Sequence, residues 1–377
     1  MTTTEAIENS VILNRHPMAS GRILLQITLN NPNAMNALSL LMIRALQTIL
    51  DNAEKDDDIH LIFLDAVGDK AFCAGGDIVE LYDALVSVDQ TVAEHVLHFF
   101  SEEYALDYTI HSYPKPIIAW GNGIVMGGGM GLFAGASFRI VTENTRIAMP
   151  ELSIGLIPDV GASYFLNQLP PGVGLFLGLT GTRLSAFEAL DFGLADTFIH
   201  HMYKSNVIAS LCQISHVDAS NLSYLFKALG RDATPSEPLL ELDRAMLSTL
   251  DEQTSVEQAQ QWIIHWAAQD LEDQRLEKAA LAVKKASPLA SKTFFEQLSR
   301  GKTLSLQDCF NMELALALAC ACEGDFKEGI RALLIDKDNI PHWRFANVDE
   351  VPYKIVLDQF RFFELKDLAN PLFCTDG

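Results

Sequence analysis

GNGIVMGGGMG, residues 121–131, connects a predicted strand over 116–120 to a predicted helix, and this junction sets the class of fold. A second glycine loop, KAFCAGGDI at residues 70–78, also joins an apolar strand to a helix. Glycine at such junctions lets backbone N–H groups approach a ligand closely, and helix N-termini add donors. Two such loops together can aim two N–H groups at one oxygen, forming an oxyanion hole. Each loop alone is equally consistent with a tight structural turn.

The segments around these loops alternate between strand and helix patterns, as parallel or mixed sheets with crossover helices do. The predicted elements are a hairpin of strands over 11–15 and 22–30, a helix from Leu38 to Ile49 capped by Asn36, a buried strand over 59–66, a helix over 78–111, and a hairpin of strands over 138–141 and 146–149.

After about residue 200 the strand pattern fades and helical spacing dominates. A polar connector with two prolines at 231–238 precedes helices predicted over 239–250, 256–270, 287–298 and 306–323. The predicted fold class is therefore α/β, with an α/β core over 11–200 and a helical C-terminal lobe over 201–377.

Composition excludes several classes of partner. The net charge of −22 argues against nucleic acid and anionic membrane surfaces, which attract basic proteins. No apolar run approaches the roughly 20 residues that span a bilayer. The polar segment 1–10 shows no targeting pattern, so a cytoplasmic location is expected, although a presequence removed earlier is compatible with it.

Other chemistries match the sequence poorly. A dinucleotide fingerprint fits Gly129, Gly131 and Ala134 with Glu151 about 20 residues on, but further glycines precede it and it lies in mid-chain. No G-x-S-x-G elbow indicates a serine thioesterase. No H-E-x-x-H motif is present, and we expect no metal and no redox cofactor.

The sequence resembles the crotonase (enoyl-CoA hydratase/isomerase) superfamily, and within it the 3-hydroxyisobutyryl-CoA hydrolase branch. The likeness extends over roughly residues 20 to 345, and the order and spacing of its motifs make it specific. The matching segments are LNNP at 29–32, NAL at 36–38, AFCAGGD at 71–77, MGGGMG at 126–131, MPE at 149–151, IGL at 154–156, PDVG at 158–161, YFL at 164–166, Phe326, EGIRA at 328–332, LIDKD at 334–338, Pro341 and Trp343.

The resemblance implies a β-β-α superhelix whose C-terminal helices cover the active site. It implies that the N–H groups of Gly76 and Gly128 bind the thioester oxygen of an acyl-CoA, which is substrate and not cofactor. Assembly into a homo-oligomer is left open. Family members often have Arg or Lys at 31–33, whereas this chain has Asn31 and Asn33. The candidate CoA or substrate contacts are instead Lys70, Ala74, Asp77, Gly127, Lys115, Arg331 and Lys337.

Two acidic positions separate hydrolases from hydratases in this resemblance. Hydratases carry a glutamate two residues after the triple glycine, and here that position is Gly131, which has no acid or base. The second glutamate corresponds to Glu151, and a further carboxylate appears at Asp159, as in the hydrolase branch. Local sequence alone favours a structural interpretation, in which Glu151 is a loop carboxylate that caps the next turn and Asp159 is a turn residue after proline.

The implied catalytic pair is thus Glu151, as nucleophile or general base, and Asp159, which orients Glu151, water or the substrate hydroxyl. The implied reaction is hydrolysis of 3-hydroxyisobutyryl-CoA to 3-hydroxyisobutyrate and CoA in valine catabolism. The alternatives are an enoyl-CoA hydratase or isomerase and a non-catalytic acyl-CoA-binding protein.

Overall fold

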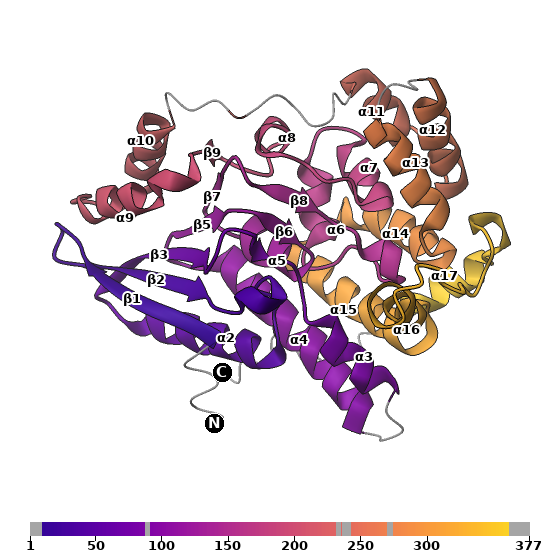
Figure 1. Cartoon of the computed structure of the whole chain (residues 1–377), viewed down its shortest axis with the longest axis horizontal. Coiled ribbons are helices and arrows are strands. Elements are labelled where there is room, and N and C mark those ends of the chain that lie inside the picture. The colour runs from indigo at the N-terminus through magenta and orange to yellow at the C-terminus, as the bar shows by residue number, and fades with distance from the viewer. Residues whose placement is uncertain (1–9, 87–90, 231–234, 236–242, 270–273, 362–377) are drawn as a thin grey trace. The chain divides into compact units, whose positions relative to one another are not determined.

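A computed structural model describes residues 10–86, 91–230, 235, 243–269 and 274–361 (Figure 1). These residues form two compact units, each assembled from segments that are far apart in the sequence. The predicted division into 11–200 and 201–377 follows element type and stays a prediction. Unit 1 holds the described residues within Met1–Gly76, Leu106–Ile147 and Leu184–Leu239, and unit 2 holds those within Asp77–Ala105, Ala148–Arg183 and Leu240–Gly377.

Unit 1 is built on a six-stranded sheet with the order β1-β2-β3-β5-β7-β9. β1 and β2 form the predicted antiparallel hairpin, and the other neighbours pair in parallel. The predicted mixed sheet is therefore confirmed. The strands are β1 (Val11–Pro17), β2 (Ile23–Leu29), β3 (Ile59–Ala66), β5 (Ile117–Gly121), β7 (Phe138–Val141) and β9 (Thr197–Phe198).

The side chains of β3 show why this strand is apolar throughout. Because successive side chains point to opposite faces of a sheet, Leu61 and Phe63 pack in one core cluster with residues of α9 (Lys204–Cys212) and α10 (Ala219–Leu229). Ile62 and Leu64 line a small apolar cavity with Leu46 of α2 (Leu40–Lys55). Both faces of the sheet are thus covered by helices, which Figure 1 shows on either side of it.

A three-stranded sheet, ordered β4-β6-β8, accompanies the glycine loops. β4 and β6 pair in parallel, and α5 (Gly128–Ala134) starts directly after β6. The sequence pattern did not reveal β6, because a strand of three residues flanked by glycines shows no periodicity. β7 and β8 belong to different sheets, so the prediction that 138–149 forms a hairpin is wrong. The strands are β4 (Ala71–Cys73), β6 (Ile124–Met126) and β8 (Arg146–Ala148).

Every described element that follows β9 is helical, as the fading strand pattern predicted. No described helix is both long and apolar enough to span a membrane. The remaining helices are α3 (Ile78–Val86), α4 (Thr91–Ser112), α6 (Ala162–Phe165), α7 (Val173–Thr180), α8 (Ala186–Asp191), α11 (Arg244–Asp251), α12 (Val256–Gln269), α13 (Gln274–Lys285), α14 (Pro288–Gly301), α15 (Leu306–Glu323), α16 (Phe326–Ile330) and α17 (Tyr353–Gln359).

Three local predictions need correction or fall outside the described chain. The first helix is capped by Ser39, whose Oγ accepts a hydrogen bond of 3.3 Å from the N–H of Met42. Asn36 is instead buried at a positive φ of 56°, and its Nδ2 donates to the carbonyl oxygens of Val67 and Ala71. The single helix predicted over 78–111 is two helices, α3 and α4. Most of the predicted connector 231–238 lies outside the described residues.

Candidate active site

The two glycine loops lie against each other in unit 1. A Cβ atom built on Gly75 would lie 3.3 Å from the carbonyl oxygen of Met126 and 3.6 Å from the nitrogen of Gly128. A Cβ atom on Gly129 would lie only 2.3 Å from the carbonyl oxygen of Cys73. Only residues without a side chain allow the end of β4 and the start of α5 to come this close.

Gly76 and Gly128 occupy the meeting point of these loops. Gly128 is the first residue of α5, so its N–H group has no acceptor within the helix. Gly76 forms an isolated parallel bridge with Leu38, in which the carbonyl oxygen of Gly75 accepts the hydrogen bond. We find no hydrogen bond from either N–H group to a described residue. Both groups are therefore available to a ligand, as an oxyanion hole requires.

An acidic side chain from α4 occupies the space beside Gly131. A Cβ atom on Gly131 would lie 2.4 Å from Oδ2 and 2.5 Å from Oδ1 of Asp107, which is fully buried. The chain therefore has no room for the glutamate that hydratases carry at this position. Asp107 could not be predicted from the sequence, because a single acid in a helical pattern has no recognisable motif.

In unit 2, Glu151 begins a short 3-10 helix that ends at Ile154. Its side chain is buried, and Oε2 has no hydrogen-bond partner among the described residues. Burial raises the pKa of Glu151 well above its ordinary value, and the charges of Asp159 and Glu103 raise it further. A carboxylate with a raised pKa is a stronger base when it is ionised.

Asp159 lies in the turn between that 3-10 helix and α6. Its Oδ2 accepts a hydrogen bond of 2.5 Å from the hydroxyl group of Tyr104, and both side chains are buried. Burial raises the pKa of Asp159 to about 7, against the opposing effect of the Tyr104 hydrogen bond. The structure thus brings Glu151 and Asp159 close enough for the charge of one to perturb the other.

Glu103 is a third acid of this cluster, and sequence reasoning missed it. It precedes Tyr104 on α4 and is only 3% exposed. Burial raises the pKa of Glu103 well above its ordinary value, and the charge of Asp159 adds to this effect. Its Oε1 has no hydrogen-bond partner in the part of the chain that the structure describes. The available signal was an acidic pair, Glu102 and Glu103, placed between Phe100 and Tyr104 in a helical segment.

The glycine loops and the acidic residues lie in a part of the chain that resembles a known protein family. A family model described as enoyl-CoA hydratase/isomerase matches residues 24–360. The chain belongs to the enoyl-CoA hydratase/isomerase family. The matched residues include both glycine loops and all the acids described above.

Curated relatives of this family member are similar over most of their length. A protein of Danio rerio named 3-hydroxyisobutyryl-CoA hydrolase, mitochondrial, is 37% identical over 91% of this chain and 88% of its own length. The Homo sapiens protein of the same name is 34% identical over 97% of this chain and 95% of its own length. The cytoplasmic location expected from the sequence stays a prediction, since the names of these relatives include the word mitochondrial.

Solved structures of the family support the fold. An enoyl-CoA hydratase from Rhodobacter sphaeroides 2.4.1 has a TM-score of 0.80 and 31% identity, covering 93% of this chain and 97% of its own. A carnitinyl-CoA dehydratase from Mycobacterium thermoresistibile has a TM-score of 0.80 and 30% identity, covering 93% of this chain and 96% of its own. The predicted crotonase-type α/β fold is therefore confirmed.

Two of the cationic side chains predicted to contact CoA form hydrogen bonds or ion pairs within the protein itself. Lys115 donates from Nζ to the carbonyl oxygens of Ala53, at 2.6 Å, and Asp56, at 2.8 Å. Arg331 forms ion pairs with the carboxylates of Glu328, Asp336 and Asp338. Neither cation is therefore an uncommitted charge, and their roles as CoA contacts stay predictions.

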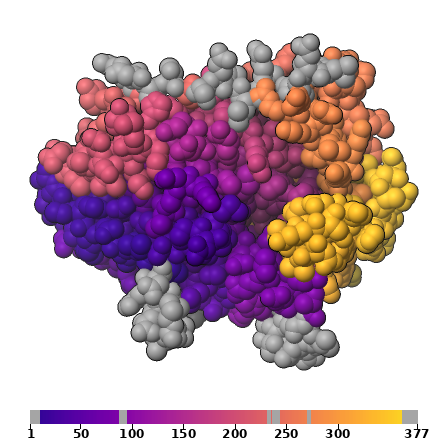
Figure 2. Space-filling model, in the orientation of Figure 1, coloured from indigo at the N-terminus to yellow at the C-terminus, as the bar shows by residue number. Residues whose placement is uncertain are grey.

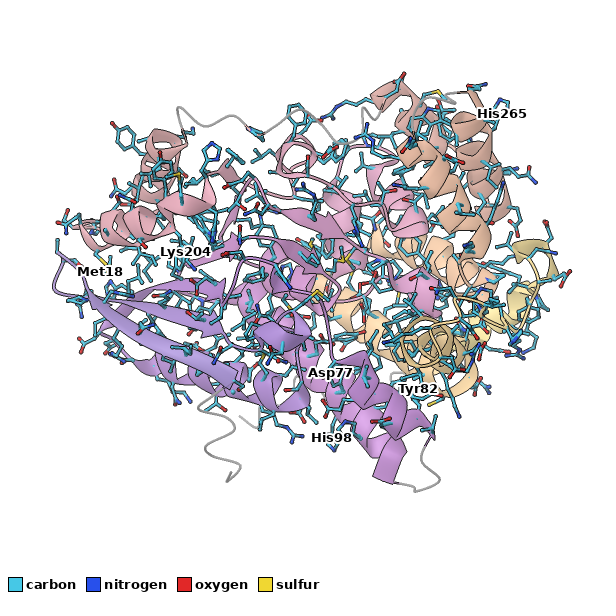
Figure 3. The ribbon with its side chains drawn as sticks, viewed as in Figure 1. Met18, Asp77, Tyr82, His98, Lys204 and His265 are labelled. Carbon is cyan, nitrogen blue, oxygen red and sulfur yellow. The ribbon has the colours of Figure 1, made fainter. Side chains whose placement is uncertain are left out.

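The other residues predicted to contact CoA or substrate lie at the surface or in the two glycine loops. Lys70 and Lys337 are exposed, and Figure 2 shows that the yellow C-terminal segment, which includes residue 337, reaches the surface. Asp77 lies at the start of α3, where Figure 3 labels it, and its Oδ1 accepts from the N–H of Glu80. Ala74 is half-buried, and Gly127 precedes α5 with a φ of 50°.

Proposed function

We propose that this chain hydrolyses short 3-hydroxyacyl-CoA thioesters, with 3-hydroxyisobutyryl-CoA as the first candidate substrate. The products would be 3-hydroxyisobutyrate and CoA, and the reaction would serve valine catabolism. The observation that carries the proposal is the buried pair Glu151 and Asp159, whose pKa values are both raised by burial. The names of the relatives with 34–37% identity support the same substrate.

The chemistry of a thioester explains what this pair contributes. Attack at the carbonyl carbon places negative charge on the carbonyl oxygen, and N–H donors stabilise that charge. We assign this task to the N–H groups of Gly76 and Gly128, which meet no acceptor among the described residues. We assign the attack to Glu151, because Oε2 of this buried carboxyl is likewise without a partner in the described chain.

Two routes remain open for Glu151. In the first, its carboxylate attacks the carbonyl carbon, the C–S bond breaks, CoA leaves as a thiolate, and water then hydrolyses the mixed anhydride. In the second, Glu151 takes a proton from a water molecule that attacks the same carbon. Both routes require the ionised form of Glu151, and both give one carboxylic acid and one thiol for each water consumed.

The structure offers a reason to prefer hydrolysis to hydration. Hydratases of the crotonase superfamily use two glutamates, and the first of them corresponds to Gly131 in this chain. Here Asp107 fills the space beside Gly131 that the side chain of this glutamate would need. Glu151 therefore lacks that particular glutamate as a partner and has Asp159 as its acidic neighbour. Such a pair suits nucleophilic or general-base attack on a carbonyl carbon better than addition across a double bond.

The decisive experiment offers the purified protein three thioesters and measures both thiol release and loss of the enoyl absorbance. The substrates are 3-hydroxyisobutyryl-CoA, 3-hydroxypropionyl-CoA and crotonyl-CoA. Thiol release from the two hydroxyacyl thioesters is the expected result. Loss of the enoyl absorbance of crotonyl-CoA without thiol release would instead identify a hydratase. Binding of CoA esters with neither reaction would identify a non-catalytic acyl-CoA-binding protein.

A further inference from the structure

The turn that carries Asp159 has an unusual backbone. Val160 adopts a positive φ of 55° and Gly161 one of 92°. Glycine tolerates this left-handed region, but a β-branched residue rarely adopts it, because its side chain crowds the backbone. Such a conformation costs on the order of 1–3 kcal/mol and persists only where the surroundings hold it. The contacts that hold this turn therefore decide where the carboxyl group of Asp159 lies.

Glu313 on α15 binds the C-terminal side of this turn. Its Oε2 accepts a hydrogen bond of 2.7 Å from the N–H of Gly161, and its Oε1 accepts one of 2.7 Å from the N–H of Ser163. Glu313 and Ser163 are fully buried. One carboxyl group thus binds two peptide groups just beyond the strained residue.

Gln297 on α14 binds both ends of the same turn. Its Nε2 donates to the carbonyl oxygen of Pro158 at 2.7 Å and to Oγ of Ser163 at 2.9 Å. Gln297 is fully buried as well. Together with the two bonds to Glu313, these contacts connect the turn to two helices more than a hundred residues further along the chain.

Two N–H groups face the side chain of Glu313, one at each oxygen, so two acceptor atoms are needed at this place. Burying a carboxylate is costly unless it is paired, and no described cation forms an ion pair with Glu313. Burial raises the pKa of Glu313 to about 8, and the charge of Asp159 adds to this effect. An amide at this position would present a donor to one of the two N–H groups, so a carboxyl group is the side chain that can bind both peptide groups of the turn.

We propose that Glu313, together with Gln297, is a positioning residue that holds the strained turn so that the carboxyl group of Asp159 stays at the hydroxyl group of Tyr104. This inference rests on the proposed hydrolysis, because Asp159 is the residue whose placement it explains. Neither Glu313 nor Gln297 is proposed to touch the substrate. We call the hydrogen bonds from Glu313 and Gln297 to this turn the clamp. Loss of the clamp therefore affects the chemical step and leaves substrate binding intact.

The test compares Glu313→Gln with Glu188→Gln. Glu188 is a matched control, because it is also buried and accepts a backbone N–H, that of Ser185, at 2.7 Å. We expect Glu313→Gln to lower kcat by about 10- to 100-fold with KM changed less than about twofold, since small misplacements of catalytic groups are costly. Glu188→Gln should change thermal stability and leave kcat of the folded enzyme unchanged.

Amide hydrogen exchange gives a readout that does not depend on activity. In Glu313→Gln the amides of Gly161 and Ser163 should exchange at least about 10-fold faster than in the wild type, because one acceptor is replaced by a donor. Faster exchange with unchanged kcat would overturn the positioning role and leave a structural one. Unchanged exchange would overturn the clamp itself. If the wild type releases no thiol from any of the three thioesters, the proposed hydrolysis fails, and exchange alone then decides the clamp.

A second variant covers the case in which Glu313→Gln does not fold. Gln297→Met keeps a similar volume and removes both donated hydrogen bonds at Pro158 and Ser163. We expect a smaller decrease in kcat, of roughly 3- to 10-fold, with KM again unchanged. An unchanged kcat in a folded Gln297→Met variant would contradict the contribution of Gln297.

Discussion

The hydroxyl group of Tyr104 donates a hydrogen bond of 2.5 Å to Oδ2 of Asp159 in the interior of unit 2. Burial raises the pKa of Tyr104 well above its ordinary value, and the charge of Asp159 raises it further, so the phenol stays protonated and keeps donating. The same bond opposes the rise that burial causes in the pKa of Asp159. Tyr104 therefore favours the ionised form of Asp159 in surroundings that disfavour it.

Replacing Tyr104 with Phe tests this relationship. The substitution removes the donor, so the pKa of Asp159 should rise and the ionised form should become scarcer at neutral pH. We expect kcat to fall by roughly 10- to 100-fold, the equivalent of one hydrogen bond to a charged group. Steady-state thioester hydrolysis measures the effect. Tyr113→Phe is the control, because the Tyr113 hydroxyl donates to the carbonyl oxygen of Leu50 and its loss should leave kcat unchanged.

Replacing Glu151 with Gln tests the proposed nucleophile or base. We expect turnover to fall by at least about 100-fold while CoA binding survives, because only the reacting carboxylate is lost. Thiol release and a separate binding titration with CoA measure the two properties. Glu296→Gln, which weakens an ion pair with Arg300, should keep normal turnover. Near-normal turnover in Glu151→Gln would remove this residue from the mechanism.

The raised pKa of Asp159 makes a prediction about stability. Burial raises the pKa of Asp159 from an ordinary value of 3.8 to about 7 in the folded protein. Between about pH 4 and 7 the folded state therefore binds more protons than the unfolded state, so stability falls as the pH rises. In Asp159→Asn the side chain at this position cannot ionise, so this loss of stability with rising pH does not occur. Relative to the wild type, this variant should gain stability, on the order of a few kcal/mol, between pH 5 and pH 8.

Urea unfolding of the wild type and Asp159→Asn at both pH values measures this difference. Because the wild type and Asp159→Asn share every other group, the titration of groups remote from Asp159 cancels in this comparison. A difference in unfolding free energy that does not change with pH would show that Asp159 titrates normally in the folded protein.

The contact between Asp107 and Gly131 predicts a strong coupling between these positions. Gly131→Ala places a methyl group within 2.4 Å of Oδ2 of Asp107 and should cost about 1–3 kcal/mol through overpacking. In Asp107→Ala the same methyl group finds space, so the double variant should be more stable than the sum of the single changes predicts. Unfolding free energies of the four proteins give the coupling, and additive effects would contradict the contact.

Much of the architecture was predictable because burial leaves a pattern in the sequence. β3 was predicted with its observed bounds because both of its faces are covered, which makes the strand apolar throughout. The antiparallel hairpin of β1 and β2 followed from two strand patterns around a glycine turn. β6 was missed because three residues between glycines show no period, and the cap at Ser39 was missed because Asn36 is an equally good capping residue.

The acidic site was only partly predictable. Glu151 and Asp159 were found through their motif, since they lie eight residues apart in a segment that resembles known hydrolases. Glu103 and Glu313 were not found, because their importance comes from contacts with residues remote in the sequence. The hydrogen bonds between Glu313 and the Asp159 turn join positions about 150 residues apart, and no local spacing encodes such a meeting.

Burial raises the pKa values of four carboxyl groups, those of Glu103, Glu151, Asp159 and Glu313. Without a ligand, these groups therefore hold more protons at neutral pH than exposed carboxyl groups do. Any ligand that binds beside these carboxyl groups and brings its own charge changes the number of protons that they hold. The heat measured on binding should therefore vary with the ionisation enthalpy of the buffer. In that sense the cluster makes ligand capture and proton exchange with the solvent a single coupled event.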